Sequence, residues 1–157
     1  MDGDAKRAAD VAAIRACVET WLEGCRRRDA ERIMSVCAPD LATFECHSVF
    51  RLDSAAAYRR FLEACFPYMQ GDMEAEIEDV DVAVDGDLGV CRYVGRFTAR
   101  DTEGQTHVSW LRATMVFRRT GGKWLAVHAH LSAPFDPMTE KVMLNRESAF
   151  GSDAPAA

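Results

Sequence analysis

The sequence has no uninterrupted apolar run that approaches the length of a membrane span. It also lacks the pattern of a secretory signal, because residues 1–10 are charged and rich in alanine and no apolar core follows them. These two absences argue against a membrane-spanning or exported chain. We therefore expect no membrane partner and a cytoplasmic location.

Positive charge is in deficit. The chain has 19 lysines and arginines against 25 aspartates and glutamates, which gives a net charge of −6 and an isoelectric point near 5.2. An acidic surface repels nucleic acid and anionic lipid, so we expect no nucleic-acid partner. The one dense basic run, Arg26–Arg28, ends a predicted helix, where cations stabilise the helix dipole.

Cysteine pairs with CxxC spacing are absent, although the chain has six cysteines. Most of the six fall on predicted apolar faces, which is typical of reduced, packed thiols rather than of a disulfide framework or a zinc site. We expect no metal and no cofactor. The length of 157 residues fits one domain. We place that domain at residues 1–144 and predict a disordered, small and polar tail at 145–157.

The stretch from His107 to Pro137 has the clearest pattern in the chain. Apolar residues alternate with period two on both sides of Arg119–Lys123, whose two glycines favour a hairpin turn. Both faces of the first strand carry apolar side chains, so we expect both to be covered. These faces are Trp110, Arg112, Thr114 and Val116 on one side, and Leu111, Ala113, Met115 and Phe117 on the other.

Helical patterns come before this hairpin. Residues 5–27 form an amphipathic stripe, and Asp29 can cap a short second helix that carries Ile33, Met34 and Cys37. A short strand is expected at Leu41–Ser48, and a third helix should follow Asp53 or Ser54.

From Met73 the apolar period changes to two, and its parity switches near Glu78–Val80, which predicts a bulge that bends the strand. A second strand is expected from Leu88 to Arg100. Helices followed by a bent antiparallel meander predict an α+β domain with a cavity inside the curved sheet.

The segment GGKWLAVHAHLSAP resembles the last strand of the NTF2-like superfamily, which includes SnoaL-like and ketosteroid-isomerase-like proteins. Cys37–Asp40, Thr43–Glu45 and Arg118-Arg119 are similar to the association (hub) domain of calcium/calmodulin-dependent protein kinase II. The resemblance runs from about Val11 to Pro137. It implies an NTF2-like (cystatin-like) cone, in which three N-terminal helices pack on a curved, mostly antiparallel sheet.

The functional residues of these families carry over poorly. The resemblance places Cys46, Trp21 and Thr114 where ketosteroid isomerases have a general-base Asp, a Tyr and a protonated Asp, so the two strong oxyanion donors are missing. This argues against a standard ketosteroid isomerase. The basic pocket of the kinase hub corresponds to Arg59, Gly95, Thr114 and Leu131, which keeps one cation.

If the resemblance sets the faces, Arg112 enters the cavity from mid-strand and binds either a ligand carboxylate or an internal acid such as Glu45. Cys46 is the candidate for proton transfer. The residues expected to bind a ligand are Arg112, Tyr93, Trp110, Tyr58, Thr114 and Trp21, and the wider lining includes Phe44, Phe61, Phe97, Val127 and Leu131.

His128 and His130 share one strand face without a third metal ligand at a clear spacing, so we expect them on the outer, dimerising face. Two hypotheses stay open. In the first, a SnoaL-like protein binds a small, partly apolar molecule in the cone as an isomerase, cyclase or hydratase-type enzyme. In the second, the chain is a non-enzymatic, hub-like oligomerisation module. Both predict a homodimer or a higher homo-oligomer.

Overall fold

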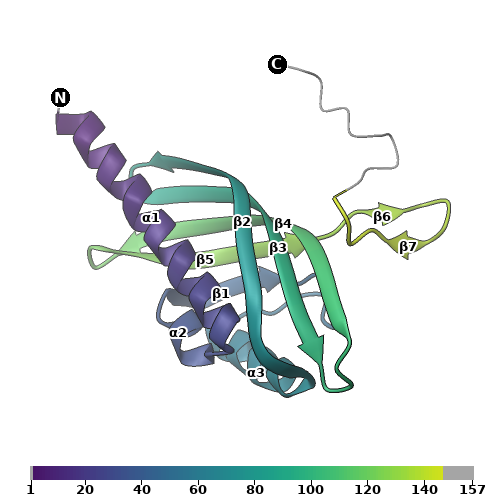
Figure 1. Cartoon of the computed structure of the whole chain (residues 1–157). Helices are drawn as coiled ribbons and strands as arrows, with labels where there is room; N and C mark the ends of the chain where they lie inside the picture. Colours follow the sequence, from purple (N-terminus) through teal and green to yellow (C-terminus); the bar gives the residue numbers. More distant parts are fainter. Residues whose placement is uncertain (1, 147–157) are drawn as a thin grey trace.

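One long helix lies across the concave side of a strongly curved sheet, and two shorter helices lie near the C-terminal end of that helix (Figure 1). A computed structural model describes residues 2–146, so residues 147–157 of the predicted tail lie outside the described residues. The helices are α1 (Asp2–Arg27), α2 (Ala30–Met34) and α3 (Ala55–Cys65), which a 3₁₀ turn (Phe66–Tyr68) extends.

Five strands form the main sheet in the order β1-β5-β4-β3-β2. β1 runs parallel to β5 and the other neighbours are antiparallel, which confirms the α+β class and makes the sheet mixed. Two short strands, β6 and β7, form a hairpin that projects beyond the end of this sheet (Figure 1). The bounds are β1 Cys37–Phe44, β2 Met69–Asp85, β3 Leu88–Asp101, β4 Thr106–Thr120, β5 Lys123–Ser132, β6 Phe135–Asp136 and β7 Lys141–Val142.

Both predicted helix caps are present. The side chain of Asp29 accepts a hydrogen bond from the Arg32 amide, and Ser54 accepts one from the Ala57 amide. The three helices occur in the predicted order with a strand between the second and the third, so they are not three consecutive N-terminal helices, and α1 is much longer than the other two. β1 also begins at Cys37 rather than at Leu41, which removes Cys37 from α2. An edge strand tolerates Pro39, which lacks an amide hydrogen, and so the strand passes through it.

The predicted bulge in β2 is confirmed. The pairing of β2 with β3 shifts between Glu78 and Asp81, and Asp79 adopts a positive φ of 54° there. The register of β4 with β5 also shifts, at a position where the sequence did not predict it. Phe117 pairs with Ala126 but Val116 pairs with His128, so Val127 is an extra residue and the parity of β5 reverses after it.

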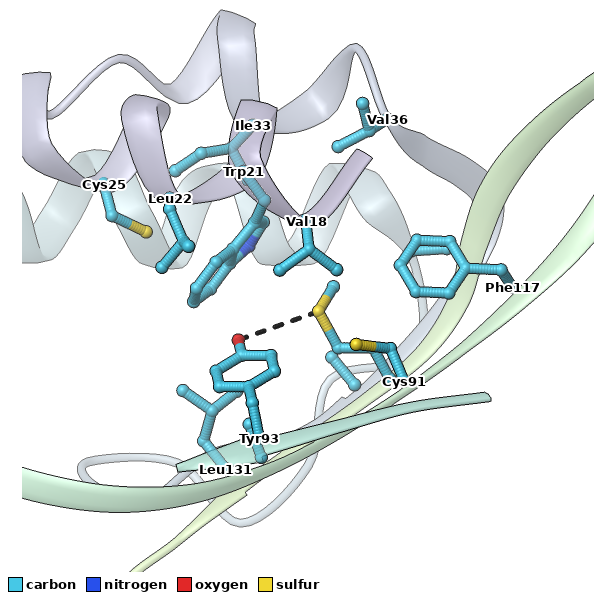
Figure 2. Close-up of a cluster of buried hydrophobic side chains, with 14 of the residues drawn as sticks. Val18, Trp21, Leu22, Cys25, Ile33, Val36, Cys91, Tyr93, Phe117 and Leu131 are labelled. Atoms are coloured by element: carbon cyan, nitrogen blue, oxygen red, sulfur yellow. Dashed lines mark hydrogen bonds between the residues drawn. The ribbon is translucent and has the colours of Figure 1, made fainter. Parts of the chain in front are cut away.

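The assignment of the two faces of β4 was wrong. Leu111, Ala113, Met115 and Phe117 are buried against the helices, whereas Arg112 is exposed on the outer face. The core joins this inner face to Trp21, Leu22 and the other buried side chains of α1 (Figure 2). The outward orientation avoids burying a guanidinium, which would otherwise need a buried partner.

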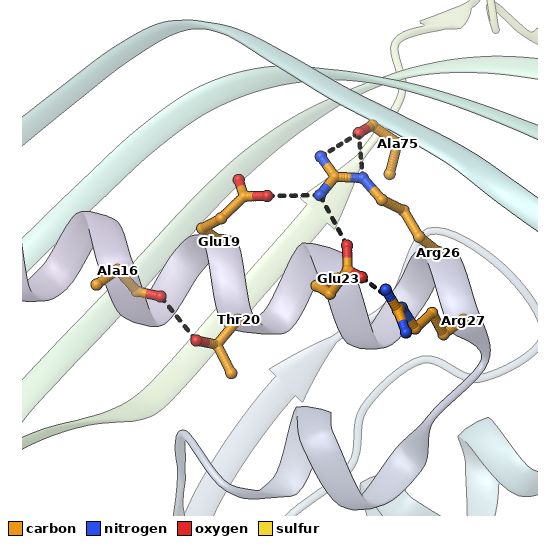
Figure 3. A network of polar contacts seen from close by, with 7 residues as sticks. All are labelled: Ala16, Glu19, Thr20, Glu23, Arg26, Arg27 and Ala75. Atoms are coloured by element: carbon orange, nitrogen blue, oxygen red, sulfur yellow. Dashed lines mark hydrogen bonds and ion pairs between the residues drawn. The ribbon is translucent and has the colours of Figure 1, made fainter.

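Three arginines, two on α1 and one just after it, attach this helix to the edge strand β2. Arg15 donates to the carbonyl oxygen of Val80 at 3.0 Å, and Arg28, just after the helix, donates to that of Met69 at 2.7 Å. Arg26 donates twice to the carbonyl oxygen of Ala75, at 3.0 and 2.7 Å, while Glu19 and Glu23 hold its guanidinium (Figure 3). These bonds give three carbonyl groups of the edge strand β2 a side-chain partner.

Candidate functional site

A cavity of about 510 Å³ lies between α1, α3 and the inner face of the sheet. Its volume suits a small organic ligand, and its surface is largely apolar. Aromatic side chains contribute much of that surface, and one carboxyl group stands among them. The lining residues in its interior include Trp21, Cys25, Glu45, Cys46, Tyr58, Phe61, Leu62, Cys65, Phe97, Leu111 and Leu131.

The isolated carboxyl group belongs to Glu45, which follows the last residue of β1. Its Oε1 atom is inaccessible to solvent and has no hydrogen-bonding partner among the described residues. Burial raises the pKa of Glu45 above its ordinary value, and the nearby Thr43 side chain opposes this shift only partly. A largely desolvated carboxyl group with one unpaired oxygen and a raised pKa is a stronger base than an exposed glutamate and can accept and return a proton.

Tyr58 supplies a hydroxyl group to the same cavity. Its oxygen accepts a hydrogen bond of 3.2 Å from Nε1 of Trp21, and both side chains are almost fully buried. Burial, followed by the charge of Glu45, raises the pKa of Tyr58 well above its ordinary value, so the hydroxyl keeps its proton. Because the oxygen already accepts from Trp21, the hydroxyl proton is available to a ligand oxygen.

Cys46 also lines the cavity, as predicted from the sequence. Burial and the neighbouring Glu45 carboxylate raise the pKa of this thiol to about 11. At neutral pH the thiol therefore stays protonated and is a weak base. Glu45 is the better candidate for proton transfer.

The structure brings Trp21, Tyr58 and Cys46 together, but not the other predicted ligand-binding residues. Tyr93 is buried in the core beside the cavity, where its hydroxyl group contacts Sδ of Met115 at 3.8 Å (Figure 2). The remaining three lie on the outer face of β4, so the prediction that they line the cavity is wrong: Trp110, Arg112 and Thr114. The described residues include no ion pair of Arg112 with Glu45 or another acid.

The wider predicted lining is correct in part. Phe61, Phe97 and Leu131 line the cavity, whereas Phe44 lies on the outer face between His128 and His130, with ring centroids 5.0 and 5.6 Å away. The two histidines thus point outward, as predicted. Within residues 2–146, no three His, Cys, Asp or Glu side chains come together in the manner of a metal site.

Sequence reasoning considered Glu45 only as a partner for Arg112 and missed it as a cavity residue. A signal was present, because Leu41, Thr43 and Glu45 share one parity in β1 and the first two are buried. Extending that alternation by one step places the Glu45 side chain on the inner side of the sheet. Cys46, one residue later, had been aligned with the general base of ketosteroid isomerases.

Polar groups gather at the mouth of the cavity. Nε2 of His107 lies 2.7 Å from Oδ2 of Asp101, and Arg100 and Ser109 are next to them in the lining. The His107 contact, together with the backbone amide of Gln105, lowers the pKa of Asp101. The cavity therefore has an apolar interior with one acid and a charged, solvated mouth.

Comparisons with known proteins agree with this architecture. A family model described as a SnoaL-like domain matches residues 14–136. An NTF2-like protein of unknown function from Pseudomonas putida is similar in structure, with 29% sequence identity and a TM-score of 0.81, over 90% of this chain and 98% of that one. Among the described residues, no helix has the length and apolar character needed to cross a bilayer.

Two other solved structures share the fold. A candidate scytalone dehydratase from Novosphingobium aromaticivorans has 12% identity and a TM-score of 0.75, over 96% of both chains. The association domain of the Caenorhabditis elegans kinase CaMKII has 19% identity and a TM-score of 0.66, over 81% of this chain and 98% of that one. These likenesses confirm the predicted NTF2-like, cystatin-like fold. At such identities they show the fold alone.

Proposed function

Because the chain belongs to the SnoaL-like domain family, we propose that it binds a small, largely apolar molecule in its cavity and transfers a proton on that molecule through Glu45. The observation that carries this proposal is the buried, unpaired Oε1 of Glu45 in the largely apolar, aromatic-rich interior of the cavity. A desolvated carboxylate oxygen without a hydrogen-bonding partner lowers the stability of the fold, and groups whose pKa is shifted by burial are frequent at functional sites.

The chemistry that suits this arrangement begins at a carbon next to a carbonyl group. Glu45 takes the proton as the C–H bond breaks, and the electron pair moves to the carbonyl oxygen. The Tyr58 hydroxyl group donates a hydrogen bond to the charge that develops on that oxygen, and Trp21 holds Tyr58 in place. Return of this proton from Glu45 to another carbon is an isomerisation. Its transfer from Glu45 to a β-hydroxyl group, whose C–O bond breaks as the carbonyl is restored and water leaves, is a dehydration.

The test uses 5-nitrobenzisoxazole, a small flat molecule whose ring opens when a base removes its C–H proton. Wild-type protein should accelerate this ring opening, with a rate that rises with pH as Glu45 loses its proton. Glu45→Gln should lower the catalysed rate by about a hundredfold. Glu63→Gln, which changes an exposed glutamate on α3, is the matched control and should keep the wild-type rate. A Glu45→Gln variant as active as the wild type would contradict the proposal.

We also propose that the chain forms a homodimer or a larger homo-oligomer through the outer face of its sheet. Phe44 is 40% exposed there between His128 and His130, and Trp110 and Val116 extend the apolar surface. Apolar side chains gathered on one sheet face are typical of a protein–protein interface. A hub-like module without catalysis is the second candidate function, and it shares this interface.

Native mass spectrometry tests the assembly. The wild type should be a dimer or larger, and Phe44→Glu should be monomeric because it places a charge in the proposed interface. Phe50→Glu is the control, since Phe50 is almost fully exposed and lies outside this face. A Phe44→Glu variant that assembles like the wild type would exclude this face. Assembly combined with an inactive cavity in the ring-opening assay would favour the hub-like module.

A further inference from the structure

The segment Lys141–Arg146, here called the C-terminal strap, lies beside the cavity. The strap residues Val142 and Leu144 line the cavity. They also line a second hollow, of about 500 Å³, together with Trp110 and Val108 on the outer side of β4. Because the same two residues line both spaces, the strap is a wall one strand thick between the cavity and the outer surface.

The sheet has a gap where the strap lies. β5 ends at Ser132, which pairs with Arg112, so the first part of β4 extends past the end of its neighbour. In the described part of the chain, one backbone hydrogen bond joins the strap to β4, from the Trp110 amide to the Leu144 carbonyl oxygen at 2.8 Å. The other backbone bonds of the strap, from the Met143 amide to the Pro134 carbonyl oxygen and between β7 and β6, stay within the projecting hairpin and do not hold it to the main sheet.

Arg146 holds the end of the strap. Its guanidinium group pairs with Glu78 and lies 3.0 Å from Oδ2 of Asp79, and it stacks over the Trp110 ring at 5.6 Å from the centroid. Both acids belong to the bulge of β2, whose distorted backbone presents them side by side. The ion pairs are 40% or more exposed, and pairs of that kind contribute little and weaken with salt.

The strap itself is poorly buried. The side chains of Val142 and Leu144 are 56% and 41% exposed, although both are apolar. A segment with few buried contacts and few backbone bonds opens at a small cost in free energy. The remaining lining comes mainly from α1, α3 and the long paired strands, with Glu45, Cys46 and His47 after β1 and the 3₁₀ turn after α3. The helices and paired strands are held by many backbone bonds and open at a larger cost in free energy.

We propose that the C-terminal strap is a releasable wall of the cavity through which small molecules pass, and that Arg146 is its latch. This inference rests on the proposed use of the cavity for a small molecule, but not on the proton transfer by Glu45. Opening breaks the Trp110–Leu144 hydrogen bond and the Arg146 ion pairs, and it joins the two hollows that the strap separates.

The experiment measures access to the cavity without a bound ligand. N-ethylmaleimide, a small neutral reagent, is added to the full chain, and the labelling rates of Cys46, which lines the cavity, and of Cys17, which does not, are followed by peptide mass spectrometry. Amide hydrogen exchange at Trp110 is measured in parallel, because this amide is released when the strap opens. The variants are Arg146→Gln, Arg146→Lys and Arg118→Gln.

Arg146→Gln should raise the Cys46 labelling rate and the Trp110 exchange rate about threefold or more, and leave Cys17 labelling unchanged. Arg146→Lys keeps the charge and should stay near the wild type. Arg118→Gln is the matched control, since Arg118 is similarly exposed (50% against 55% for Arg146) and pairs with Asp40 far from the strap. High salt should bring the wild type close to Arg146→Gln.

An unchanged Cys46 labelling rate in Arg146→Gln would overturn the proposal, whether or not the Trp110 amide exchanges faster. A rise that Cys17 shares equally would also overturn it, since that result indicates global loosening. A Glu45→Gln variant that is as active as the wild type in the ring-opening assay would leave the labelling result unaffected, because labelling of Cys46 requires no proton transfer by Glu45.

Discussion

Nε1 of Trp21 donates a hydrogen bond of 3.2 Å to the hydroxyl oxygen of Tyr58 and thereby joins α1 to α3 inside the cavity. Tyr58→Phe should leave the buried indole N–H without its partner and lower the free energy of unfolding by about 1–2 kcal/mol. Urea unfolding measures the change. Tyr68→Phe, at an exposed position, should have no effect. Equal stability of Tyr58→Phe and the wild type would mean that this bond contributes nothing.

Glu45 makes stability depend on pH in a defined direction. Burial raises its pKa above 4.5 in the folded protein, so between the unfolded and folded pKa values the folded state binds more protons. Stability therefore falls as pH rises through that window. Glu45→Gln should remove this fall and, near neutral pH, unfold with a free energy about 1 kcal/mol above the wild type.

The measurement is thermal or urea unfolding of both proteins across the acidic to neutral range. The gain from Glu45→Gln should shrink as the pH falls through that window and be lost well below pH 4.5, where the wild-type carboxyl group is neutral in both states. Glu63→Gln again serves as the exposed control. Parallel pH curves for Glu45→Gln and the wild type would show that Glu45 is not desolvated in solution.

Arg26 and Arg27 are adjacent in sequence but differ in what they contact (Figure 3). Arg26 bonds to the Ala75 carbonyl oxygen, whereas Arg27 pairs with Glu23 within its own helix and is 65% exposed. Arg26→Met should lower the free energy of unfolding by about 1–2 kcal/mol. Arg27→Met should change it by less than about 0.5 kcal/mol. Urea unfolding measures both variants. An equal decrease in the free energy of unfolding for the two would show that Arg26 does not attach α1 to β2.

The orientation of β4 can be tested with one charge at two neighbouring positions. Met115 is fully buried, so Met115→Glu should prevent folding or lower the free energy of unfolding by about 3 kcal/mol or more. Val116 lies on the outer face, and Val116→Glu should keep the fold. Circular dichroism melts distinguish the two. A folded Met115→Glu together with an unfolded Val116→Glu would restore the face assignment made from the sequence.

Local patterns in the sequence were sufficient for the elements. The glycine pair gave the β4–β5 turn, Asp29 and Ser54 gave two helix starts, and the switch of apolar parity gave the bulge at Glu78–Asp81. Each of these features is determined by residues that are close to it in the sequence. Such signals do not depend on the rest of the fold.

The orientation of β4 could not be obtained in the same way. Period two shows that Leu111, Met115 and Phe117 share a face, but both faces of this strand are apolar, and the pattern does not say which one meets the helices. The extra residue Val127 has no glycine or proline signal. The importance of Glu45 depends on side chains from distant elements, since burial and the lack of a partner are properties of the folded cavity.

The arginine contacts along β2 affect how readily the protein aggregates. β2 has 17 residues and lies at the edge of the sheet, where free carbonyl groups can pair with a strand from another molecule. Arg15, Arg26 and Arg28 already occupy the carbonyl groups of Val80, Ala75 and Met69. While these bonds to α1 and to the residue after it are intact, they hinder the pairing of a second molecule at this edge. Any condition that detaches α1 before the sheet unfolds converts a protected edge into a template for aggregation.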